Sequence, residues 1–162
     1  MIKLKNEGVC LKIGISIYEV HEIDSYFKNV DIIQAPLNFF NSSFIKSDVV
    51  LELRKVGLEF HARGIFHQGT LLNPSRASEI FPKDFARFAE FCEKNNFSKI
   101  QAALAVFDMQ EIFSSLVIGV NSEEQLSSIL DTPVADRVTS SHLLDFPYDQ
   151  VLVDPRRWGG VK

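Results

Sequence analysis

The run Val30-Asp31-Ile32-Ile33-Gln34-Ala35 decides the fold, because it is short, rich in β-branched residues and followed by Pro36. Such a run is typical of a buried strand. Three more runs of this kind occur, at Leu11 to Ile17, Leu58 to Arg63 and Leu116 to Val120. Segments with helical spacing lie between them. The alternation predicts parallel strands joined by right-handed crossovers, since a tight turn cannot reach a parallel neighbour.

Helices are expected wherever apolar side chains recur every three or four residues. Gly57 is a natural C-terminal cap, Pro82 suits a first turn, and Ser122 with Gln125 matches a capping box. The helix from Pro82 is expected to bury one face. The periodicity weakens from Asp131 to Lys162, which predicts a tail that wraps the surface. The expected helices are 20–27, 46–56, one from about 82, 99–106 and 122–130, and the buried face of the third is Phe85, Phe88, Ala89 and Cys92.

Composition favours one globular domain over residues 1–162. The chain is 46% hydrophobic and 23% charged, with 14 Phe residues to fill a core. A net charge of -4 without a basic run argues against nucleic acid as a partner. Cys10 and Cys92 lack disulfide or metal-ligand patterning, which favours a reducing, cytoplasmic setting. No apolar window reaches the roughly 18 residues of a membrane span, so no membrane association is expected.

Four strings resemble the second half of the aldo/keto reductase family, and they occur in the family's order. They are Lys12 to Tyr18, Val30 to Asn38, Leu58 to Gly69 and Val117 to Leu126, and Asp154 to Trp158 resembles the tail of a bacterial branch. The resemblance covers about Lys3 to Leu130. It implies an α/β fold that is half of a (β/α)8 TIM barrel, four parallel strands with flanking helices, equivalent to strands five to eight.

The same resemblance implies a nucleotide site without catalytic residues. The family's Asp, Tyr, Lys and His tetrad belongs to the first four βα units, so no catalytic residue is assigned here. Ser16 and Gln34 fall where the family holds the nicotinamide carboxamide, and Arg63 falls where many members have an aromatic ring. Asn121 and Ser122 fall at the adenosine end, where the helix N-terminus offers a generic phosphate site. Because Val120 and Gln125 supply no positive charge, weak binding of NAD or NADP is expected, and no metal.

Plain structural roles compete with these assignments. His61 and Arg63 share one face of a strand, and the simpler interpretation makes His61 a hydrogen-bonded interior residue and pairs Arg63 with Glu59. His67 is expected to be a solvated loop residue. Asp31 and Asp108 are interpreted as caps or turn residues.

Two functional hypotheses follow. The first is an aldo/keto reductase-like oxidoreductase half, inactive alone, whose missing N-terminal half comes from elsewhere. The alternative is a non-catalytic binding or assembly module, and whether the chain is an enzyme is left open. The first and last strands would be unpaired sheet edges, which predicts a homodimer that closes an eight-stranded barrel, unless the tail from Asp131 covers one edge.

Overall fold

The computed structural model describes residues 1–25, 27–73, 76–108, 110–133 and 148–160. Four parallel strands form one sheet in the order β1-β2-β3-β4, so the spatial order equals the chain order. The fold is therefore α/β with an all-parallel four-stranded sheet, as the alternation predicted. The outer strands are shorter than expected, three residues each. The strands are β1 (Gly14–Ser16), β2 (Ile32–Pro36), β3 (Glu59–Arg63) and β4 (Ser115–Val117).

The two faces of the sheet differ in polarity. Along β3, Phe60 and Ala62 are buried, whereas His61 and Arg63 point to the other face and are half-buried. The neighbouring strand follows the same pattern, because Gln34 is in register with His61. One face of the sheet thus packs in the hydrophobic core, and the opposite face carries polar side chains.

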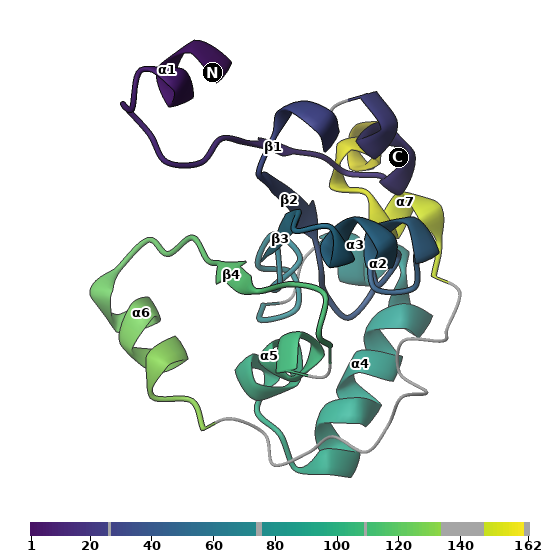
Figure 1. Ribbon diagram of the computed structural model, residues 1–162. Coiled ribbons are helices and arrows are strands. Elements are labelled where there is room, and N and C mark those ends of the chain that lie inside the picture. The colour runs from purple at the N-terminus through teal and green to yellow at the C-terminus, as the bar shows by residue number, and fades with distance from the viewer. Residues whose placement is uncertain (26, 74–75, 109, 134–147, 161–162) are drawn as a thin grey trace.

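Helices α2 (Asp48–Lys55), α4 (Pro82–Asn95) and α5 (Lys99–Asp108) cover the apolar face, and the short α3 (Arg76–Ile80) leads into α4 (Figure 1). Aromatic rings fill the space between them: Phe39 lies edge-on to Phe88, with the ring centroids 5.0 Å apart. Burying such rings removes large apolar areas from water without leaving a polar atom to satisfy. The high Phe content is therefore a property of the core.

The segment 20–27 is not the single α-helix that the spacing predicted. It forms two 3₁₀ helices, η1 (Val20–Ser25) and η2 (Phe27–Asn29). The Glu22 carboxylate accepts hydrogen bonds from the backbone N–H groups of Tyr18 and Glu19, both at 2.7 Å, and this closes a tight turn at the start of η1. A tight turn of this kind suits the short pieces in which 3₁₀ helices occur.

Helix α4 begins at Pro82 as predicted, and three residues of its expected inward face, Phe85, Phe88 and Cys92, pack in or against the core. Phe88 and Phe91 are buried, whereas Ala89 is exposed. The Phe91 ring packs against Phe39 and Phe97, at centroid distances of 5.4 and 5.9 Å. The inward face of α4 therefore includes Phe91, which was not expected, and excludes Ala89.

The C-terminal segment enters the core, which corrects the prediction of a tail on the surface. Residues 148–160 contain α7 (Gln150–Val153) and η4 (Pro155–Gly160), and the Leu152 side chain is fully buried. Residues 134–147 of the predicted tail lie outside the described part.

Two further helices, α1 (Ile2–Asn6) and α6 (Glu123–Leu130), contain no buried residue. Both stand away from the helices on the apolar face, at the left of the view in Figure 1. No helix in the described part of the chain is long and apolar enough to cross a membrane.

Candidate functional site

A pocket of about 840 Å³ lies at the edge of the sheet where the strands end. Gln34 of β2, Arg63 at the end of β3 and Val117 of β4 line it, and α6 forms the facing wall through Asn121, Glu124 and Gln125. Ligands of parallel α/β proteins bind at this carboxyl edge. The volume falls within the roughly 300–1,000 Å³ of small-molecule sites. The pocket is therefore large enough for a nucleotide.

Two of the predicted site residues, Gln34 and Arg63, line this pocket, and a third, Ser16, lies next to both. The Arg63 Nε group donates a hydrogen bond to the Ser16 hydroxyl at 2.9 Å, and that hydroxyl lies 3.5 Å from the Gln34 side-chain oxygen. The register of β1, β2 and β3 produces this arrangement, because Ser16 is paired with Gln34, Gln34 is paired with His61, and Arg63 lies two residues beyond His61 on the same face. A charged guanidinium and an amide thus face the pocket, and a hydroxyl lies beside them.

The predicted Arg63–Glu59 pair is wrong. The Glu59 carboxylate instead bonds to Lys12, and its second oxygen lies 3.7 Å from His61 Nε2. Lys12 holds the pKa of Glu59 below its usual range through this bond. Within the described residues Arg63 has no carboxylate partner, so its charge is available at the pocket. His61 is half-buried beside Glu59, which agrees with a structural role.

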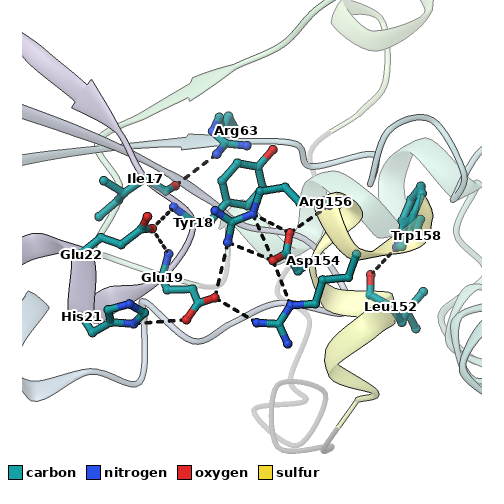
Figure 2. Close-up of polar contacts among 11 residues, drawn as sticks. Ile17, Tyr18, Glu19, His21, Glu22, Arg63, Leu152, Asp154, Arg156 and Trp158 are labelled. Atoms are coloured by element: carbon teal, nitrogen blue, oxygen red, sulfur yellow. Dashed lines mark hydrogen bonds and ion pairs between the residues drawn. The ribbon is translucent and has the colours of Figure 1, made fainter. Parts of the chain in front are cut away.

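The Tyr18 ring lies beside the Arg63 side chain (Figure 2). The guanidinium carbon of Arg63 lies 4.2 Å from the centroid of the Tyr18 ring, within cation–π range. A second hydrogen bond runs from Arg63 Nη2 to the Ile17 carbonyl at 3.1 Å. The side chain is thus fixed by three contacts, one with the last residue of β1 and two with the loop that follows it.

The same tyrosine ring carries a second guanidinium, that of Arg156 in η4, 4.0 Å from its centroid. Arg156 donates to both oxygens of the Asp154 carboxylate, at 2.9 to 3.1 Å, and this bond lowers the pKa of Asp154. Arg156 and Arg157 both reach Glu19, at 3.4 and 3.2 Å. The C-terminal segment therefore contacts Tyr18 and Glu19, which follow β1, although it lies far from them along the chain.

The predicted adenosine-end residues lie on the opposite wall. Asn121 lines the pocket, and its backbone N–H donates to the Gln125 side-chain oxygen at 2.9 Å. The Ser122 hydroxyl accepts from the Gln125 N–H at 3.3 Å, which makes Ser122 the N-cap of α6 as predicted. Its hydroxyl is therefore used within its own helix. Only backbone N–H groups of this turn remain for a phosphate.

Charge is sparse in the pocket. Of the described lining residues, Arg63 is the only cation and Glu124 the only anion. A hydrogen bond from Ser122 keeps the pKa of the Glu124 carboxyl below its ordinary value. The α6 end of the pocket is thus negative, and the β3 end is positive.

The floor of the pocket is a loop with four left-handed residues. Gly64, His67, Gln68 and Gly69 have φ between +49° and +80°. The buried Asn38 side chain donates to the Gly64 carbonyl at 3.2 Å, which ties the loop after β2 to the loop after β3. Non-glycine residues adopt this conformation only where surrounding contacts impose it. The loop is therefore held in one shape.

His67 supplies those contacts and is not the solvated residue that was expected. Its side chain is 1% exposed, and its Nε2 donates to the Leu152 carbonyl at 2.8 Å. Nδ1 lies 2.8 Å from the Thr70 hydroxyl. Burial lowers the pKa of His67 to about 4, so the ring is neutral at physiological pH. His67 joins the pocket floor to the C-terminal segment.

No protein-family model matches the chain, and no curated protein matches it.

Two site residues were missed by the sequence argument. Tyr18 and Arg156 position Arg63, but neither was assigned a role. The signal for Arg156 was the polar string at Asp154 to Trp158. Among the described residues no cluster of His, Cys, Asp or Glu has the arrangement of a metal site.

Proposed function

We propose that this chain is an aldo/keto reductase-like half-barrel that binds a nicotinamide nucleotide weakly and does not reduce carbonyl compounds by itself. The observation that carries the proposal is the junction of Ser16, Gln34 and Arg63 at the mouth of an 840 Å³ pocket. A hydroxyl and an amide suit a carboxamide, and a guanidinium suits a pyrophosphate or stacks on an aromatic ring.

The orientation of the nucleotide follows from the two ends of the pocket. The nicotinamide and pyrophosphate belong near Arg63, where the positive charge lies. The adenosine belongs beside α6, where the pocket is lined by the uncharged polar residues Asn121 and Gln125. Glu124 at that end repels a 2′-phosphate, so the pocket gains nothing from NADP over NAD.

The surroundings of two tyrosines favour the alternative, which is a non-catalytic binding or assembly module. Carbonyl reduction needs a positioned acid to protonate the developing alkoxide. Tyr148 is buried, and burial raises its pKa to about 12, which makes it a poor acid. Tyr18 packs against two arginines, and no lysine contact to it is found in the described part of the chain. We therefore propose binding without turnover as the function of this chain alone.

The test is NADH binding measured by calorimetry with Arg63→Ala beside Arg54→Ala. Arg54 is an exposed cation on α2, so its loss changes the net charge equally without touching the pocket. A charge-assisted hydrogen bond contributes roughly 1.5–3 kcal/mol, so Arg63→Ala should weaken binding by about tenfold or more. Equal affinities of the two variants would remove the proposed site.

A further inference from the structure

The N-terminal arm, residues 1–13, is an apolar surface without a core of its own. Leu11 is 91% exposed and Val9 is 69% exposed. Helix α1 within the arm buries no side chain and leaves Ile2 and Leu4 about half exposed. Polar contacts such as the 2.5 Å pair of Lys5 with Asp31 join it to the body, and Ile13 at its end is buried. Large apolar side chains this exposed are typical of a contact surface.

Helix α6 also exposes large apolar side chains. Leu130 is 73% exposed and Leu126 is 43% exposed, and the two lie four residues apart, on one face of the helix. Figure 1 shows α1 and α6 on the same side of the molecule, away from the helices that cover the sheet.

Each of these surfaces adjoins an open edge of the sheet. The arm leads into β1, and α6 follows β4, and these are the two end strands in the described part. An unpaired strand edge presents N–H and C=O groups to another chain. Both edges are three residues long, so either matches the other in length.

The two surfaces carry opposite charge. Between Met1 and Ile13 there are three lysines and one glutamate, whereas between Asn121 and Asp131 there are three acidic residues and no basic one. Opposite charges steer two such surfaces together and disfavour contact between like surfaces. The surface that matches the arm in charge is therefore α6, which lies beside the other edge of the sheet.

We infer that a second copy of this chain covers both surfaces, with β1 of each copy beside β4 of the other. A two-fold axis parallel to the strands generates both junctions and keeps all eight strands parallel, which closes a barrel and leaves no sheet edge. The arm of each copy then packs against α6 of the other.

The second copy completes the pocket. One wall of the pocket consists of residues 117–121, at the end of β4 and directly after it. In the closed arrangement the end of the partner's β1 and the loop that follows it lie beside this wall. If the proposed nucleotide site holds, association and nucleotide binding are thermodynamically linked, so NAD strengthens the dimer.

The association is tested by light scattering at micromolar concentration without nucleotide. The expected mass is twice the 18.4 kDa of one chain. Leu11→Glu and Leu130→Lys each place a charge in both junctions and should give monomers. An equimolar mixture of the two should recover dimers, because one junction then pairs two unchanged surfaces and the other pairs opposite charges.

The matched control is Val56→Glu. Val56 is 77% exposed at the C-terminal end of α2, away from both edges, and its variant should remain dimeric. A wild-type mass of one chain overturns the inference, and so does a dimer that survives both leucine changes. A dimer that forms while NADH binding is absent upholds the association and rejects the proposed nucleotide function instead.

Discussion

At the residue scale, the Tyr148 hydroxyl is buried without a hydrogen bond. It is the one buried side-chain polar atom of the described residues that lacks a hydrogen-bond partner, while its ring lies edge-on to Phe40 at 5.2 Å. A buried hydroxyl without a partner costs roughly 1–3 kcal/mol, whereas the ring contributes apolar burial. Tyr148→Phe should therefore raise the free energy of unfolding by about 1 kcal/mol in urea denaturation. Tyr18→Phe is the control and should change it little. A loss of stability in Tyr148→Phe would mean that the hydroxyl has a partner.

His67 makes stability depend on pH in a window of its own. Its pKa is about 4 in the folded chain and near 6.5 when unfolded, because burial disfavours the charged ring. Between these values the unfolded state binds more protons, so the free energy of unfolding falls as pH falls, by on the order of 3 kcal/mol across the window. Carboxyl groups whose pKa is lowered in the folded chain, such as Asp154, change the free energy of unfolding only below about pH 4.5.

The measurement is urea denaturation between pH 7 and pH 5. The wild-type chain should lose stability over this range, and His67→Gln should be nearly flat. His21→Gln is the control, because His21 is exposed. A flat wild-type profile would show that His67 is not held neutral by burial.

At the element scale, β1 depends on a glycine. A Cβ on Gly14 would lie 2.7 Å from the Ile32 carbonyl oxygen, a backbone atom that cannot move without breaking the β1–β2 pairing. Gly14→Ala should therefore cost about 1–3 kcal/mol of stability. Gly119→Ala, after β4, meets no atom within 4 Å and should cost little. Equal unfolding midpoints for the two variants in urea would contradict the close packing of β1 on β2.

Local sequence patterns correctly predicted the features that neighbouring residues determine. Gly57 has a φ of +95° at the end of α2, and Ser122 caps α6, because both features depend on neighbouring residues. The solvated state expected for His67 and the Arg63–Glu59 pair were wrong, because the actual partners of both residues are distant in the chain. The burial of His67 depends on Leu152, 85 residues away, and Arg63 reaches Ser16 through the register of three strands. Periodicity carries no information about such pairings.

At the scale of the whole molecule, the order of the strands was predictable, and the pocket was predictable only in part. Ser16, Gln34 and Arg63 were named from the sequence, and they meet in space. Their support from the C-terminal segment was not foreseen, because Arg156 contacts Tyr18 and Glu19 across nearly the full length of the chain. The role of that segment became clear only from the fold.

The proposal of binding without turnover predicts an inactive chain. A general acid contributes typically 10²–10⁴-fold to such a reaction, and no tyrosine in the described part is placed as one. Purified residues 1–162 should not oxidise NADPH or NADH with a panel of small aldehydes. Turnover above background that disappears in Arg63→Ala would show that the pocket carries chemistry of its own.

The central claim is that the pocket accepts a nicotinamide nucleotide and has no cation for a 2′-phosphate. Calorimetric titration of one protein preparation with NAD and then with NADP tests it most directly. We expect weak, saturable binding of both, with dissociation constants within tenfold of each other, since Val120, Glu124 and Gln125 offer no positive charge at the α6 end. NADP bound at least tenfold more tightly than NAD, or no binding of either, would contradict the account.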